Sequence, residues 1–192
     1  MSKSLKIMID DYIMLKMQED INYVELYKTK SKELNYEDYV EYAMVFCPDH
    51  MWFIESFGLE NAFKLAASYI KANENKINNC KHFDDIIKLM YNGKIKNFDE
   101  FSQYDRALAM GIYLNLMPSK VFVHAGPRYA LKYILGTGYN SKIKTLEGTN
   151  KIEYIDICDL PIEFQQFKDN IYLVVDCLCY IYSRLKKNKL LK

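Results

Sequence analysis

The residues best placed for chemistry lie between Val121 and Arg128. The short apolar run 121–123 predicts a buried segment that delivers His124 to a turn at Gly126-Pro127. Pro127 then begins a helix, and Arg128 falls in its first turn. The first turn of a helix presents free N–H groups and the positive end of the helix dipole. With an imidazole and a guanidinium beside it, this arrangement predicts a site for a phosphate or a carboxylate.

The same histidine could also act as an acid or base, with Asp105 orienting it and Arg128 holding a phosphate. The other ligand-binding candidates are Gly126, Ser102, Lys96 and Lys120. A purely structural alternative stands beside this interpretation. In that alternative His124 caps or crosses a turn, and Arg128 pairs with an acid such as Asp105.

Two pairs of thiol and imidazole side chains supply the ligand types of a tetrahedral zinc site. They are Cys47 with His50, and Cys80 with His82. Neither spacing is a standard one, and the pairs are about thirty residues apart, so we expect no metal and no cofactor. The remaining thiols, Cys158, Cys177 and Cys179, are interpreted as small apolar residues. No Gly-rich phosphate loop, paired catalytic carboxylates or Ser-x-x-Lys motif is present.

The segment 83–136 resembles the helix-hairpin-helix unit of DNA-binding proteins. Two predicted helices, 83–92 and 102–116, flank a tight turn, Ile95-Lys96-Asn97-Phe98-Asp99. Asn97 and Asp99 stand where the family has glycines, and both residue types tolerate positive φ. The resemblance implies a hairpin whose backbone N–H groups contact a DNA phosphate.

The resemblance extends to the helix-hairpin-helix DNA glycosylases. Val123-His124-Ala125-Gly126-Pro127-Arg128 lies where those enzymes carry Val-Asp-x-His and a following helix with a basic residue. Here His124 stands in place of the catalytic aspartate. The lysine of the bifunctional members has no counterpart near Phe101 or Ser102. The resemblance therefore implies the helical architecture without glycosylase chemistry.

Composition bounds the class of protein. The chain has 192 residues, a formal charge of +1, 17 Tyr and 10 Phe, and 11 Gly and Pro together, which favours one compact helical domain with short loops. A near-zero net charge gives no global field for nucleic acid, so binding must use a local patch. One local excess exists at the C-terminus, where the basic residues are Arg184, Lys186, Lys187, Lys189 and Lys192.

The N-terminus lacks the features of a signal peptide, and no run of about 18 apolar residues suggests a membrane span. Five cysteines without framework spacing fit reduced thiols. We therefore expect a cytoplasmic protein that does not enter a membrane.

Helical periodicity recurs along the first half of the chain. It predicts a first helix over 5–27, interrupted near 19–22, a polar connection over 28–33, and a second helix that begins at Asn35 and Asp38 and ends before Pro48. Further helices are expected over 48–57, 59–72 and 83–92, with a polar loop over 73–81. Gly93 is expected to adopt a left-handed cap.

The helix after the hairpin carries two local signals. Ser102 and Asp105 have the spacing of a capping box. Gly111 costs about 1 kcal/mol relative to Ala inside a helix, so we expect a neighbouring backbone to pack closely against it.

Beyond Gly136, glycines and asparagines punctuate short segments, which predicts an irregular insert over 137–160 with a β-hairpin near 138–158. Pro161 opens a helical turn, and 169–187 is expected to be a buried helix. The sequence thus predicts a single, mainly all-α domain over 1–192, with about eight helices, a helix-hairpin-helix-like core over 83–136 and a minor β-hairpin.

Three functions follow from these patterns, in order of preference. The first is a protein that binds nucleic acid, such as DNA, or a phosphate-containing ligand without glycosylase activity. The second is an enzyme acting on a nucleic acid or nucleotide through His124, Asp105 and Arg128. The third is a protein-protein interaction module with an apolar, tyrosine-rich groove.

Overall fold

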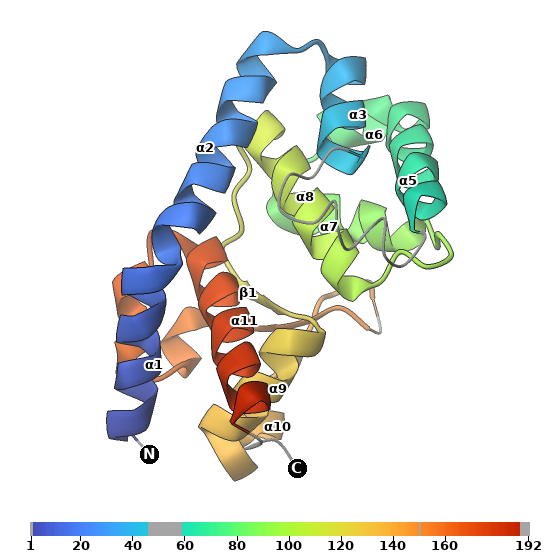
Figure 1. Cartoon of the computed structure of the whole chain (residues 1–192). Coiled ribbons are helices and arrows are strands. Elements are labelled where there is room, and N and C mark those ends of the chain that lie inside the picture. Colours follow the sequence, from blue (N-terminus) through green and yellow to red (C-terminus); the bar gives the residue numbers. More distant parts are fainter. Residues whose placement is uncertain (1, 46–58, 150, 189–192) are drawn as a thin grey trace. The chain divides into compact units, whose positions relative to one another are not determined.

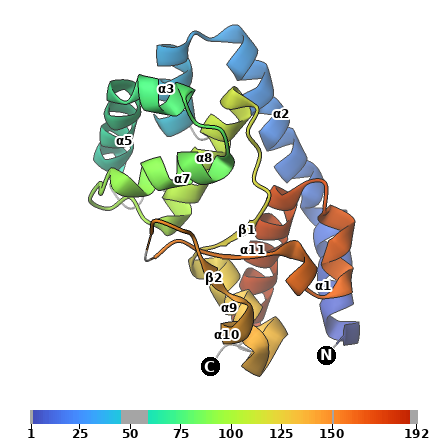
Figure 2. The same ribbon diagram turned by 180° about the vertical axis from the view of Figure 1, so that it is seen from behind.

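The protein is mainly α-helical with a small antiparallel sheet, as the sequence predicts (Figures 1 and 2). The computed structural model describes residues 2–45, 59–149 and 151–188. These residues form two compact units, one of 1–23 with 119–192 and the other of 24–118. We refer to them as the terminal unit and the central unit. Whether 1–192 behaves as one domain stays a prediction.

The central unit is built only from helices within its described residues. They are the second part of α2 (Met17–Glu33), α3 (Tyr36–Val45), α5 (Glu60–Ala72), α6 (Glu74–Asn78), α7 (Phe83–Asn92) and α8 (Glu100–Leu114). Helix α3 packs against α5 and α8, and α7 packs against α8 (Figure 1). Tyr39 is fully buried among them, and its hydroxyl donates a 2.7 Å hydrogen bond to the carbonyl of Ala109.

A buried cation also belongs to this core. The guanidinium of Arg106 donates to the carbonyl of Ala43 at 3.1 Å and lies 4.9 Å from the centre of the Phe63 ring. Arg106 is only 1% exposed. A charge at this depth requires such partners, because desolvation of an ion without them is costly.

The terminal unit places a long buried helix between other elements. It contains α1 (Ser2–Leu15), the first part of α2, β1 (Val121–Val123), α9 (Ala125–Leu135), α10 (Tyr139–Lys142), β2 (Lys144–Thr145), β3 (Glu153–Ile155) and α11 (Ile171–Lys187). Three short 3₁₀ helices lie at Gly136–Gly138, Ile157–Asp159 and Ile162–Phe167. Helices α1, α9 and strand β1 all pack on α11 (Figure 1).

The sheet has the order β1-β3-β2, with both pairs antiparallel (Figure 2). Val121 pairs with Ile155 and Val123 with Glu153, while Lys144 pairs with Tyr154. The expected hairpin is therefore confirmed as β2 and β3. The apolar run 121–123 adds a third, fully buried strand to it.

Several local predictions are confirmed. Helix α7 has the expected bounds, and α5 and α11 lie where apolar periodicity placed them. The N–H of Asp38 donates to the side-chain oxygen of Asn35 at 3.0 Å, so Asn35 begins α3 as an N-cap residue. Gly111 is closely packed, because a Cβ there would lie 2.5 Å from the carbonyl oxygen of Leu116.

Other local predictions are wrong. The first helix breaks at Lys16 instead of near 19–22, and 28–33 continues α2 instead of forming a connection. Ion pairs between residues three apart, Lys28 with Glu25 and Lys30 with Glu33, stabilise this polar end. The segment 73–81 contains α6, which is anchored by the fully buried Ile77.

The predicted capping residues of the hairpin also need correction. Helix α8 begins at Glu100, and its N-cap is Asp99, whose carboxylate accepts a 2.8 Å hydrogen bond from the N–H of Ser102. Ser102 is therefore the third helical residue and not the cap. Gly93 has φ −62°, and the positive φ of 45° falls on Lys94 instead.

Glycine at position 93 has a different reason. A Cβ there would lie 3.1 Å from the Tyr69 ring, so the ring leaves little room for a side chain. The helix expected over 48–57, together with Cys47 and His50, lies outside the described residues.

Candidate functional site

The predicted site residues fall into two groups. Lys120, His124, Gly126 and Arg128 belong to the terminal unit, and Lys96, Ser102 and Asp105 belong to the central unit. A site that joins His124 to Asp105 stays a prediction.

The turn before α8 has one of the two expected backbone features. Asn97 has φ 64°, which is the positive value that its place in the hairpin predicts. Asp99 has φ −77° and caps α8 with its carboxylate. The N–H of Ser102 is thereby used by a side chain of the same turn, and a phosphate approaching it would meet a carboxylate. Lys96 is exposed in this turn, and Asp105 is half-buried on α8.

His124 is the N-cap residue of α9, which begins at Ala125 and not at Pro127 as the sequence predicts. Gly126 and Pro127 therefore lie inside the first turn of the helix and do not form a separate turn before it. Its carbonyl accepts a hydrogen bond from the N–H of Arg128 at 2.9 Å, which closes the first turn. Its side chain is only 4% exposed, and Nε2 lies 4.0 Å from the Sγ of Cys179 on α11. The imidazole therefore faces a neighbouring helix in the interior of the terminal unit.

Arg128 lies in the first turn of α9 and pairs with an acid from the sheet. Its Nε donates to Oε2 of Glu153 on β3 at 3.1 Å, and both side chains are about 30% exposed. The structural alternative proposed an ion pair with an acid such as Asp105. The structure shows an ion pair of Arg128, but its acidic partner is Glu153.

Two more aromatic side chains lie beside cations on this part of the terminal unit. The ammonium of Lys120 lies 4.8 Å from the centre of the Tyr154 ring, and that of Lys132 lies 5.5 Å from the Tyr139 ring. Both geometries are those of a cation–π contact. The Lys120 side chain thus packs on the sheet, over Tyr154 of β3.

Sequence reasoning noted Tyr182 as a tyrosine that could stack on a base, but it missed that Tyr182 stacks on Tyr129. Tyr129 on α9 and Tyr182 on α11 have ring centres 5.5 Å apart and ring planes inclined by 20°. Tyr129 is 50% exposed, so part of its ring is open to solvent. The periodicity of each helix marks these residues as helical, but it gives no sign that they meet.

The helices that carry the stacked tyrosines are basic. Helices α9, α10 and α11 together hold six basic residues and one acidic residue, Asp176. Arg184 is held by Asp11 at 3.0 Å. Lys186 and Lys187 are exposed, and neither makes an ion pair with any residue that the structure describes. Lys189 and Lys192 lie outside the described residues.

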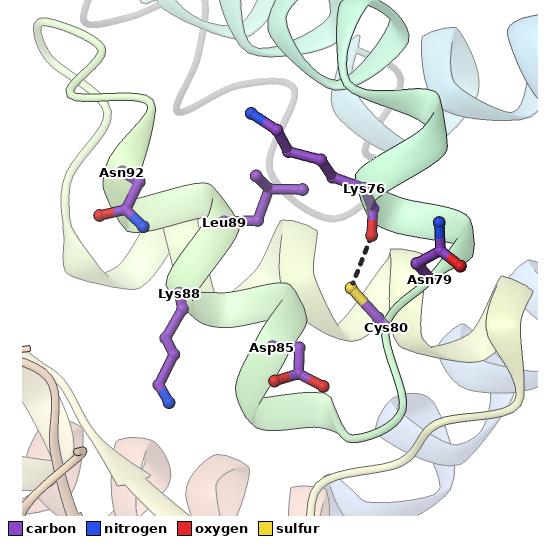
Figure 3. Close-up of a pocket in the computed structure, with 7 residues that line it drawn as sticks. All are labelled: Lys76, Asn79, Cys80, Asp85, Lys88, Leu89 and Asn92. Carbon is purple, nitrogen blue, oxygen red and sulfur yellow. Dashed lines mark hydrogen bonds between the residues drawn. The ribbon is translucent and has the colours of Figure 1, made fainter. Parts of the chain in front are cut away.

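The central unit contains a pocket of about 400 Å³ between α6 and α7 (Figure 3). Its polar groups serve the connection between these helices. The Asp85 carboxylate accepts from the N–H groups of Lys81 and His82 at 3.0 and 3.1 Å, and the Cys80 thiol lies 3.4 Å from the carbonyl of Lys76. The residues that line the pocket are Lys76, Asn79, Cys80, Asp85, Lys88, Leu89 and Asn92.

The surroundings of this pocket shift the pKa of two side chains, Asp85 and Cys80. Hydrogen bonds from the backbone of Lys81 and His82 lower the pKa of Asp85. Burial and the nearby Asp85 carboxylate raise the pKa of the Cys80 thiol. The residues that the structure describes contain no group of three or more potential metal ligands.

Comparison of the chain with protein-family models, with curated proteins and with solved structures finds no match. Among the helices that the structure describes, none is both long enough and apolar enough to cross a bilayer.

Proposed function

We propose that the protein binds single-stranded nucleic acid, with the stacked tyrosines and the lysines of α9 and α11 as its binding surface. The observation that carries this proposal is the half-exposed stack of Tyr129 on Tyr182. It lies on two helices whose charged residues are almost all basic. Stacking platforms beside cations are the usual means of binding unpaired bases and their phosphates.

The geometry of the stack favours an unpaired base as its partner. Tyr182 covers one face of the Tyr129 ring and fixes its orientation, while half of the Tyr129 side chain is open to solvent. A base could extend this stack by one ring without reordering either tyrosine, which keeps the entropic cost of binding low. Bases within a duplex are already stacked, so a single strand should bind more tightly.

The lysines supply the second part of the interaction. Lys186 follows Tyr182 by four residues and Lys187 follows it by five, while Lys132 follows Tyr129 by three residues. Because Lys186 and Lys187 are exposed and have no acidic partner in the described part of the chain, a phosphate would not compete with an internal carboxylate. Each phosphate contact releases a condensed counterion and makes binding dependent on salt.

Two other surfaces are less suited to the same ligand. The hairpin before α8 presents the Asp99 carboxylate at the helix terminus. The first turn of α9 has His124 buried and Arg128 paired with Glu153. An interface for a protein partner would also use tyrosines, but exposed lysines are depleted in such interfaces.

The proposal is tested by fluorescence anisotropy with labelled single-stranded oligonucleotides of mixed sequence. We expect binding at about 50 mM salt that weakens as salt is raised. Tyr129→Ala should weaken it by about 1 to 3 kcal/mol, the usual effect of removing one stacked ring. Lys186→Ala with Lys187→Ala should reduce the slope of log affinity against log salt by about 1.4, since each phosphate contact in a single strand contributes about 0.7.

Matched controls come from the central unit. Leu65 on α5 is 54% exposed, so Leu65→Ala removes an apolar side chain of similar exposure from a helix that carries none of the proposed binding residues. Lys64→Ala removes one exposed charge from the same helix. Absence of binding at low salt, or equal losses in these controls and in Tyr129→Ala, would contradict the proposal.

A further inference from the structure

The geometry points to Cys179 as a reactive thiol that is activated by His124 and exchanges with low-molecular-weight disulfides. This inference is independent of nucleic-acid binding. It rests on a contact between α11 and the first turn of α9, where the Sγ of Cys179 lies 4.0 Å from Nε2 of His124. A thiol paired with an imidazole is the arrangement that produces a nucleophilic thiolate.

The second component of the site is the helix terminus itself. A Cβ built on Gly126, the second residue of α9, would lie 3.5 Å from the Sγ of Cys179. The sulfur therefore lies beside the first turn of an eleven-residue helix, whose positive dipole end favours a negative charge nearby. The imidazole and the helix terminus thus act on the same atom from the same element.

The two side chains differ in their exposure to solvent. His124 is 4% exposed, whereas Cys179 is half-buried and open to solvent in part. The imidazole is therefore shielded from solvent, and the proposal requires that the exposed part of Cys179 includes its sulfur. The charged groups nearest in sequence or by contact are Asp176, three residues before the thiol on α11, and Arg128, which Glu153 of β3 holds.

The other thiols within the described residues, Cys80, Cys158 and Cys177, lack this combination. Cys177 is fully buried, and burial together with nearby carboxylates raises the pKa of its thiol. The pKa of Cys80 is also raised by burial and by Asp85. Cys158 is exposed on a short 3₁₀ helix and is the natural control for access.

The proposed step is a thiol–disulfide exchange between Cys179 and oxidised glutathione. His124 Nε2 accepts the proton of the Cys179 thiol, and the thiolate attacks one sulfur of oxidised glutathione. The sulfur–sulfur bond of the reagent breaks as the mixed disulfide at Cys179 forms. The departing glutathione thiolate then takes the proton from the His124 imidazolium.

The test measures modification of each cysteine of the intact chain by oxidised glutathione, using peptide mapping by mass spectrometry at pH 6.0, 7.0 and 8.0. An ordinary thiol with a pKa near 8.5 loses about tenfold in thiolate for each pH unit below that value. The rate at the exposed Cys158 is measured in the same samples for comparison. We expect the rate at Cys179 to fall less than about threefold between pH 8.0 and pH 6.0.

The variant His124→Asn should give Cys179 the same pH dependence as Cys158, and circular dichroism checks that the variant is folded. If that variant unfolds, the pH dependence of the rates at Cys179 and Cys158 in the wild-type protein still tests the inference. A rate at Cys179 that falls as steeply as the rate at Cys158, or a Cys179 that stays unmodified while Cys158 reacts, would overturn the inference. Neither result would bear on oligonucleotide binding, because no nucleic acid is present.

Discussion

Gly111→Ala should destabilise the protein, although alanine is the better helix former. At the end of α8 the chain turns back through Asn115, which has φ 56°, and the N–H of Leu116 donates to the carbonyl of Gly111 at 2.7 Å. A Cβ at position 111 would lie 2.5 Å from the Leu116 carbonyl oxygen and 3.1 Å from the Phe83 ring. The first contact is with backbone, so a side-chain rotation cannot relieve it.

The magnitude follows from three opposing terms. Alanine gains about 1 kcal/mol in helix propensity over glycine. Moving the backbone away loses the Leu116 hydrogen bond, worth about 1 kcal/mol. Overpacking against Phe83 costs about 1 to 3 kcal/mol. The net loss of unfolding free energy is therefore about 1 to 3 kcal/mol, and each kcal/mol corresponds to about 2 to 4 °C in melting temperature for a chain of this size.

Thermal and urea unfolding followed by circular dichroism measure this loss. The control is Gly138→Ala, because no heavy atom lies within 4 Å of a Cβ at that position and its φ is −76°. That substitution should be neutral or stabilising by about 0.4 to 1 kcal/mol, through a less flexible unfolded chain. A Gly111→Ala variant that melts at or above the wild-type temperature would refute the argument from close packing.

Three other predictions concern a helix cap, a titrating carboxylate and metal. Asp99→Ala should cost about 1 kcal/mol, because the N–H of Ser102 loses its carboxylate acceptor, whereas Asp99→Asn should cost less; urea unfolding that ranks the two variants equally would contradict this. The lowered pKa of Asp85 means that its contribution to stability is complete above about pH 4, the range of an unfolded carboxyl group, and is lost as the pH falls through the lower folded value. Asp85→Asn should therefore flatten the dependence of unfolding free energy on pH between 5 and 2. If this dependence is the same in the variant and the wild type, the Asp85 carboxylate does not contribute to stability. Finally, the melting temperature should be the same with and without a chelator, and elemental analysis that finds one zinc per chain would contradict this expectation.

The parts of the fold that the sequence predicted depend on local chemistry. The bounds of α7, the cap at Asn35 and the packing constraint at Gly111 each follow from a few neighbouring residues. The polar end of α2 was misread, because its helix is supported by charge pairs such as Lys30 with Glu33 and not by an apolar stripe. Polarity alone does not distinguish such a helix from a loop.

The components of the proposed surface and of the thiol site could not be predicted in the same way. His124 and Cys179 are 55 residues apart in sequence, and Arg128 and Glu153 are 25 apart. Their contacts depend on how α9 packs on α11 and how β1 pairs with β3, and both arrangements are tertiary. The sequence identified His124 and Arg128 as residues of interest, but it assigned them partners on a different segment.

The location of the nucleic-acid surface is tested most directly by photocrosslinking. A single-stranded oligonucleotide that carries 5-iodouracil is irradiated with the wild-type protein at low salt, and the crosslinked peptides are mapped by mass spectrometry. The aromatic rings that stack on the iodouracil base are expected to form the crosslink. We therefore expect crosslinks in the peptides that contain Tyr129 and Tyr182. Crosslinks confined to the hairpin between α7 and α8, or no crosslink above that of a denatured control, would contradict it.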